Sequence, residues 1–147
     1  MIDELDRKVV RVLNGNARKS FREVAKEVGT SAPAVIHAVK RLEGAGALRG
    51  YVPLVDPEYF GVGLAAIVAV RFSKGKLLET QKRIARDPHV AAVYDVTGDW
   101  DSFIIGRFAG REDLNGFVKG LLAIPHVDRT VTHLVLNTVK EDPRVPV

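Results

Sequence analysis

Cysteine is absent from this chain of 147 residues. Its absence excludes disulfide bonds, zinc sites built on thiolates and a cysteine nucleophile, and it fits a reducing compartment. Long hydrophobic runs are also missing, since the longest, Val62 to Val70, is broken by Gly63 and is too short to cross a bilayer. Hydrophobic residues still make up 46% of the chain, which is enough for a packed core. We therefore expect a cytoplasmic protein without a membrane segment.

Sequence motifs of metal and phosphate chemistry are lacking as well. The four histidines show no zinc-type spacing, and no glycine-rich phosphate loop is present. Asp99 and Asp101 are a pair of carboxylates beside an aromatic residue, but no His, Ser or Lys is spaced to work with them. We expect no metal and no cofactor. An enzyme is one alternative function for this protein, and the spacing of these residues does not favour it.

Residues 20–48 predict two short helices joined by a tight turn. Ser20 and Glu23 form a Ser-x-x-Glu capping box, so a helix should begin at Phe21. Gly29 supplies a left-handed residue that ends this helix, and Ser31 caps the next one. A pair of helices joined in this way is typical of a helix-turn-helix that places its second helix in the DNA major groove.

The second helix of this pair has an apolar face and a basic face. Val35, Val39 and Leu42 recur at helical spacing and should point inward. Between residues 18 and 49 there are seven Lys or Arg against three Asp or Glu, an excess that phosphate attraction requires. A solvated surface helix would show similar charges. The residues that we predict to contact DNA are Arg18, Lys19, Arg22, Ser31, Ala32, Pro33, His37, Lys40 and Arg41.

Changes of pattern along the chain predict three parts. Residues 1–47 should form the helical head, because an apolar helical stripe from Asp3 adds a third helix to the pair. Residues 48–63 alternate like an extended strand before Asp56-Pro57 and Gly61, so we expect a linking strand or hinge. Residues 64–147 should form a second domain.

The second domain is expected to follow the order strand, helix, strand, strand, helix, strand. Its first helix should cover residues 76–86, with Leu78 and Gln81 in the apolar stripe, and its last strand should cover residues 130–139. The tripeptide Pro-His-Val occurs at residues 88–90 and again at 125–127, each time between a helical stripe and a strand. Two similar halves of this kind describe a ferredoxin-like βαββαβ sandwich, so the fold class is α+β. Helices cover only one face of such a sheet. Because the other face is also rich in apolar residues, we expect a homodimer that buries it.

Several short stretches together resemble the Lrp/AsnC (leucine-responsive, feast/famine) family of transcriptional regulators. The most telling are Val28-Gly29-Thr30-Ser31, Val39-Lys40-Arg41-Leu42-Glu43 and Thr97-Gly98-Asp99-Trp100-Asp101. The resemblance covers nearly the whole chain. It implies a winged-helix-like DNA-binding head, a linking strand, and a C-terminal domain that dimerises, sometimes assembles into octamers, and senses a small metabolite, usually an amino acid.

The same resemblance implies a place for the effector. Carried over residue by residue, the site falls on Gly98, Asp99, Trp100 and Asp101, with Thr132 and His133 opposite. An aspartate there can pair with an α-ammonium group, and loop N–H groups can receive a carboxylate. The same four turn residues are also compatible with an ordinary solvated turn.

One departure from the family pattern keeps a second function open. The family usually has an arginine in the recognition helix where this chain has Ala38, and a lost arginine removes a phosphate or base contact. The function that we expect from the whole sequence is that of a sequence-specific DNA-binding regulator that responds to a metabolite. The alternative is a metabolite-binding, oligomerising module with weak or lost DNA binding.

Overall fold

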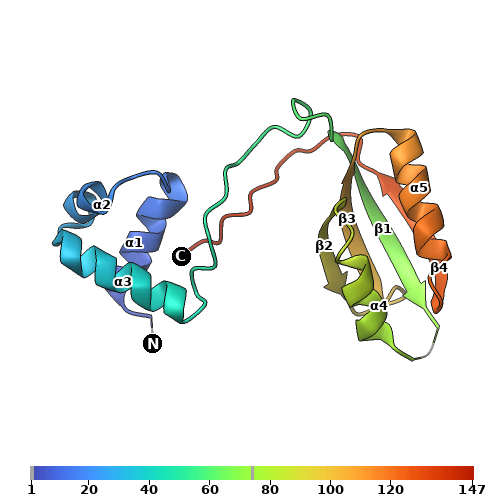
Figure 1. Ribbon diagram of the computed structural model, residues 1–147, viewed down its shortest axis with the longest axis horizontal. Helices are drawn as coiled ribbons and strands as arrows, with labels where there is room; N and C mark the ends of the chain where they lie inside the picture. Colours follow the sequence, from blue (N-terminus) through green and yellow to red (C-terminus); the bar gives the residue numbers. More distant parts are fainter. Residues whose placement is uncertain (1, 74) are drawn as a thin grey trace. The chain divides into compact units, whose positions relative to one another are not determined.

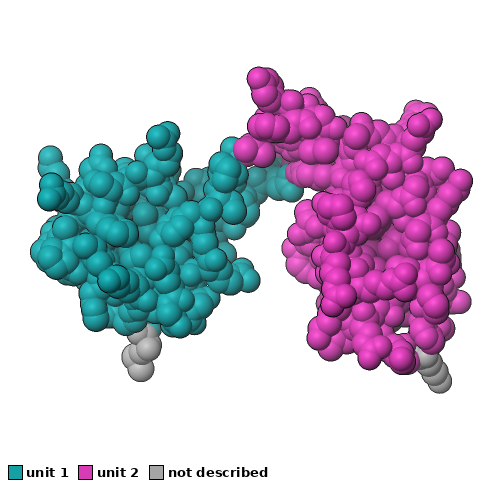
Figure 2. Space-filling model, in the orientation of Figure 1, with its two compact units in different colours: residues 1–54, 140–147 teal, residues 55–139 magenta. Residues whose placement is uncertain are grey.

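The computed structural model describes residues 2–73 and 75–147, and the chain forms two compact units (Figures 1 and 2). Unit 1 contains residues 1–54 together with 140–147, and unit 2 contains residues 55–139. The division expected from sequence assigned the last eight residues to the second domain, whereas the contacts group them with the first. Among the described residues, no helix is long and apolar enough to span a membrane.

Unit 1 is built on three helices, α1 (Glu4–Gly15), α2 (Phe21–Val28) and α3 (Ala32–Gly44). Each begins at a capping side chain, because the first backbone N–H groups of a helix have no partner inside it. Asp3, Ser20 and Ser31 supply these caps. The start of α2 at Phe21 confirms the expectation from the capping box.

The core of unit 1 lies where the three helices meet. Its buried side chains come from all three helices, and the inward direction of Val35, Val39 and Leu42 is confirmed. The other buried apolar members are Val9, Leu13, Val24, Ala25 and Ala38. These small and branched side chains let the helices approach closely, so the core fixes which face of α3 remains outside.

The segment expected to be a linking strand is not one. Residues 45–63 contain turns and extended backbone but no strand, and Val52 and Leu54 are 79% and 67% exposed. The alternating pattern indicates extended chain. A strand, however, requires a neighbouring strand for its hydrogen bonds, and a single protomer supplies none to this segment.

The C-terminal tail packs on α1. The side chain of Arg11 donates a hydrogen bond from Nε to the main-chain oxygen of Val147 at 2.6 Å, and Asn14 donates from Nδ2 to that of Val145 at 3.0 Å. These bonds join residues more than 130 positions apart. They explain why residues 140–147 belong to unit 1.

Unit 2 has the expected order β1 (Leu64–Phe72), α4 (Leu77–Ile84), β2 (Val90–Asp95), β3 (Ser102–Phe108), α5 (Arg111–Leu122) and β4 (Val127–Leu134). The strands form one antiparallel sheet in the order β2-β3-β1-β4 (Figure 1). This order is that of a ferredoxin-like fold, so the fold class is confirmed. The last strand begins three residues before the Thr130 expected from its alternation.

The two faces of the sheet carry different side chains. Alternate residues of β1 and β3, among them Val68, Ile104 and Phe108, are fully buried and pack with Phe117 and Leu121 of α5. Gln81 of α4, expected in the helical stripe, is buried and donates to Ser102 Oγ at 2.6 Å. Leu78, expected in the same stripe, is instead 62% exposed, because α4 is only two turns long and presents one narrow face.

The opposite face of the sheet has no helix on it. Ile67, Phe103, Ile105 and Val131 lie on this face and are half-buried, and Tyr94 beside Phe103 is 57% exposed. The side chains of successive strand residues alternate between faces, so this apolar surface follows directly from the register. We call these five residues the open sheet face.

Candidate nucleic-acid interface and effector site

The joint between α2 and α3 is fixed by local hydrogen bonds and one glycine. Ser20 N–H donates to Glu23 Oε2 at 2.7 Å, and Glu23 N–H donates to Ser20 Oγ at 3.3 Å. The bond from the Ser20 backbone, with that from its hydroxyl, lowers the pKa of the Glu23 carboxyl. Gly29 has φ of 77°, the left-handed conformation that only glycine adopts without strain, and α3 starts three residues later. The joint therefore sets the direction of α3.

The outer face of α3 is free of the scaffold. Ser31, Pro33, His37 and Lys40 are all exposed, whereas the inner residues of α3 are at most 4% exposed. Ala32 is half-buried at the start of the helix. The helix thus presents a polar, basic face that a DNA groove can accommodate.

The predicted DNA-contacting cations fall into two groups. Arg18 and Arg22 are exposed, and together with Lys40 they take part in no ion pair with any residue in the described part of the chain. Lys19, by contrast, is paired with Glu27. The unpaired cations are available to bind phosphate, whereas a phosphate contact by Lys19 competes with its ion pair to Glu27.

Arg41 forms part of the scaffold. Its Nη2 donates to Asp3 Oδ2 and to Asp6 Oδ1, both at 2.7 Å, and thereby ties α3 to the start of α1. Asp6 is 1% exposed; burial opposes its ionisation, yet hydrogen bonds from the Asp3 backbone and from Arg41 leave its pKa below the ordinary value. The hydrogen bond to Asp6 raises the pKa of Arg41. Sequence periodicity placed Arg41 outward correctly but missed these two partners.

Ala38 lies in the core of unit 1, not on the outer face of α3. It is 1% exposed and packs with Val9, Val24 and Val35. In this chain, position 38 therefore contributes to packing, and its side chain is not part of the exposed face of α3.

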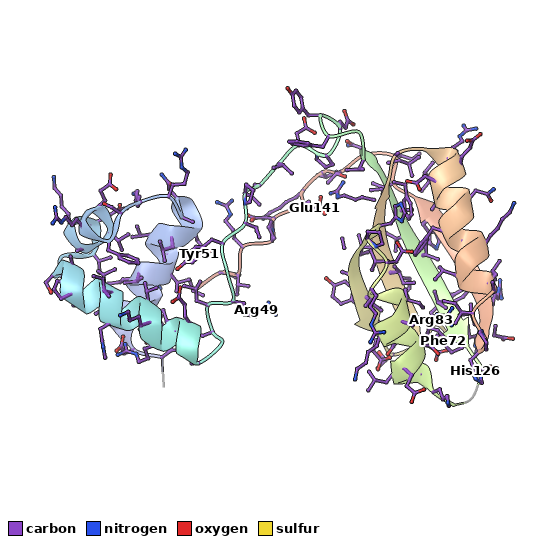
Figure 3. The ribbon with its side chains drawn as sticks, in the orientation of Figure 1. Arg49, Tyr51, Phe72, Arg83, His126 and Glu141 are labelled. Atoms are coloured by element: carbon purple, nitrogen blue, oxygen red, sulfur yellow. The ribbon has the colours of Figure 1, made fainter. Side chains whose placement is uncertain are left out.

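The turn at residues 98–101 connects β2 to β3 at the end of the sheet where β1 finishes. Asp101 is held there by β1, since its Oδ2 accepts from Phe72 N–H at 2.7 Å and its own N–H donates to Val70 O at 3.1 Å. Figure 3 labels Phe72 and His126 at this same end of unit 2. Gly98 has φ of 109°, and Asp99 is exposed. Asp101 thus has a structural partner, and Asp99 is the carboxylate directed to solvent.

The last strand does not bring both of its expected residues to this turn. Thr132 and His133 pair with Val68 and Ile67, so their side chains lie on opposite faces of the sheet. Within one protomer the β4 residue beside the turn is Arg129, whose guanidinium carbon lies 5.3 Å from the centroid of the Trp100 ring. Sequence reasoning missed Arg129 because it began the strand at Thr130.

A second polar cluster, which the sequence did not indicate, surrounds His89. Its Nδ1 lies 2.7 Å from Asp87 Oδ1 and its Nε2 lies 3.0 Å from Asp113 Oδ1, while its ring stacks on Phe108. The hydrogen bond to Asp87 is the main cause that raises the pKa of His89. The cluster lines a groove of about 510 Å³ between α4 and α5. Within the described residues no three His, Cys, Asp or Glu side chains are placed to hold a metal.

Comparison with known proteins decides the family. A model of the AsnC-type helix-turn-helix domain matches residues 2–43, and a model of the Lrp/AsnC ligand-binding domain matches residues 65–145. The chain belongs to the Lrp/AsnC family. This is a family of transcriptional regulators, which are not enzymes. In this chain, the helical unit is the DNA-binding head, and the ferredoxin-like unit is the ligand-binding domain.

Relatives match over almost their full lengths. A protein of Pyrococcus abyssi named as an HTH-type transcriptional regulator is 41% identical over 145 residues, which is 99% of each chain. A Neisseria meningitidis transcriptional regulator solved in complex with L-Met has a TM-score of 0.90 at 28% identity, over 99% of this chain and 97% of that one. The leucine response regulatory protein of Mycobacterium tuberculosis has a TM-score of 0.88 at 28% identity, over 99% and 100%.

Proposed function

We propose that this Lrp/AsnC regulator binds double-stranded DNA through the outer face of α3 and that an amino acid controls this binding. The observation that carries the first part is the division of α3 into a buried inner face and an exposed basic outer face. The proposed contacts are Ser31, Ala32, Pro33 and His37 in the groove, with Arg18, Arg22 and Lys40 on phosphates. Lys19 and Arg41 support this surface through their ion pairs.

The effector site that we propose is the turn of residues 98–101. Support comes from the Neisseria regulator of similar fold that was solved with L-Met, and from the exposed Asp99, which can pair with an α-ammonium group. Because Thr132 and His133 lie on opposite faces of the sheet, they do not both line this turn within one protomer, and we propose that they contribute across an interface between chains. We assign the protein no cofactor and no catalytic role, and its work on DNA implies a cytoplasmic location.

A homodimer through the open sheet face is the third part of the proposal. This surface joins four half-buried apolar side chains to the exposed Tyr94, and a large apolar patch on one face of a small domain is typical of an interface. Two-fold pairing would also give two DNA-binding heads for two half-sites. Further assembly of dimers, up to an octamer, would be read from the mass of the full chain in solution.

DNA affinity as a function of salt tests the proposal. The full chain is used to select fragments of genomic DNA, and the affinity for a selected fragment is then measured at rising salt. The Lys40→Ala variant should lower the slope of log affinity against log salt by about one, because one phosphate contact is lost. The matched control is Lys119→Ala on α5, which should leave the slope unchanged.

Two results would overturn parts of this proposal. A chain that retains no DNA at low salt would support the alternative, a metabolite-binding module without DNA binding. An unchanged salt slope in Lys40→Ala would remove α3 from the interface. Turnover of an amino acid by the full chain would overturn the absence of a catalytic role.

A further inference from the structure

Two arginines lie directly opposite each other beside the turn of residues 98–101. The antiparallel register of β1 and β4 pairs Arg71 with Arg129, and both are exposed. Directly opposed side chains on one face of a sheet lie close together, and like charges in this arrangement repel. In the part of the chain that the structure describes, neither arginine forms an ion pair with a carboxylate. The pair therefore lacks a counter-charge.

Trp100 holds one of the two arginines at the surface. The guanidinium carbon of Arg129 lies 5.3 Å from the centroid of the Trp100 ring, which is the distance of a cation–π contact. Trp100 is itself half-buried, so it offers a firm support. This contact orients the guanidinium of Arg129 without neutralising its charge. Its N–H groups stay available for an anion, and a guanidinium matches the shape of a carboxylate.

The carboxylates of the turn do not neutralise the two arginines. Asp101 Oδ2 accepts from the backbone N–H of Phe72 and serves to join the turn to β1. Asp99 is exposed, and its carboxylate has no hydrogen-bonding partner among the described residues. The surroundings of Trp100 thus present two guanidinium groups and one unengaged carboxylate. The complementary ligand carries two negative charges and one positive charge.

We propose that Arg71, Arg129 and Trp100 form a carboxylate-binding site and that the effector of this protein is an acidic amino acid. The inference rests on the proposed effector site at the same turn and names the chemical class of its ligand. One or both carboxylates of the ligand bind the two guanidinium groups, and its ammonium group pairs with Asp99. Binding relieves the repulsion between β1 and β4 at the end of the sheet, so it also stabilises unit 2.

Ligand discrimination by the full chain tests the charge match. Binding of L-glutamate, L-aspartate, L-glutamine and L-methionine is followed by the fluorescence of Trp100, the only tryptophan, and by calorimetry. We expect L-glutamate or L-aspartate to bind at least ten times more tightly than L-glutamine. Glutamine has the same shape as glutamate but lacks the second carboxylate, so equal affinities for these two, with no preference for aspartate, would overturn the proposal.

Charge-removing variants test the residues. Arg129→Gln and Arg71→Gln should each weaken binding of the preferred acidic amino acid about tenfold or more, whereas Arg111→Gln, an exposed arginine on α5, should not. Unchanged affinity in both variants would overturn the proposal. The proposal would also be overturned if the two variants changed only the mass of the protein in solution, because the arginines would then serve contacts between copies of the chain.

A parallel measurement of DNA binding separates this inference from the function on which it rests. If a neutral amino acid binds and changes DNA affinity while acidic ones do not, the proposed effector site survives and the acidic class is wrong. If no amino acid binds at all, the effector part of the proposed function fails together with this inference. The DNA-binding part is tested independently by the salt dependence.

Discussion

At the scale of single residues, neighbouring side chains with the same charge have different roles. Lys40 and Arg41 are adjacent and exposed on α3, yet only Arg41 is bonded to Asp3 and Asp6. Asp6 is buried, so it depends on its ion pair with Arg41 to remain ionised in the core. A basic residue on the proposed DNA-contacting helix can thus act on the scaffold instead of the ligand.

Replacing Arg41 should destabilise the DNA-binding head. The Arg41→Ala variant leaves Asp6 buried without its cation, so we expect the free energy of unfolding to fall, and to fall clearly more than in a control variant at the neighbouring position. Lys40→Ala, the control on the same helix, should stay within about 0.5 kcal/mol of the parent. Denaturant unfolding followed by the helical circular dichroism signal measures both. Equal stabilities would show that the ion pairs contribute nothing measurable.

The His89 cluster should make stability depend on pH. The pKa of His89 is raised in the folded protein above the ordinary value of 6.5, mainly by the hydrogen bond to Asp87. Protonation of His89 therefore favours the folded state. The stabilisation is fully present below about pH 6.5 and is lost as the pH rises through the folded pKa. Thermal unfolding between pH 5.5 and 9 should therefore show a decline that the His89→Gln variant lacks. A parallel decline in both proteins would assign it to other groups.

At the scale of elements, short local patterns decide where helices begin and end. The capping box at Ser20, the left-handed Gly29 and the cap at Ser31 fix α2, the turn and the start of α3. These signals act between residues at most four positions apart, which is why sequence alone identified them. The boundaries of α4 and β4 lack comparable signals and were placed less accurately.

Gly29 should tolerate substitution poorly. Its φ of 77° is unfavourable for a residue with a Cβ atom, although open space surrounds the position. Gly29→Ala should therefore lower the free energy of unfolding by about 1 kcal/mol and weaken DNA binding by misdirecting α3. Gly15→Ala at the end of α1, where φ is not positive, provides the control and should be neutral or stabilising. The comparison uses denaturant unfolding and DNA affinity, and similar losses in the two variants would contradict the role of backbone conformation.

At the scale of the whole molecule, the two layers of unit 2 leave one face without cover. Helices α4 and α5 pack on one face of the sheet, and the open sheet face keeps its apolar side chains at the surface of a single chain. Association of two copies removes this surface from water. The same register that builds the core of unit 2 therefore produces its candidate interface.

A charge on the open sheet face should prevent association. Phe103→Glu places a carboxylate in the centre of the proposed dimer interface, and sedimentation should show its mass shift from two chains or more to one. Leu122→Glu makes the same kind of change on α5, where the side chain is already 50% exposed, and should leave the mass unchanged. A Phe103→Glu protein that still sediments as the parent would place the interface elsewhere.

Sequence by itself determined the helix caps, the order of helices and strands along the chain, the α+β fold class and the inward face of α3. These follow from side-chain patterns within a few residues, where periodicity and backbone preferences act directly. Only the tertiary structure decided that Arg41 pairs with Asp6, that Asp101 binds the backbone of Phe72, and that Arg129 lies opposite Arg71. Each of these contacts joins residues about 30 or more positions apart. Packing and strand register bring them together, and no local pattern encodes the distance between them.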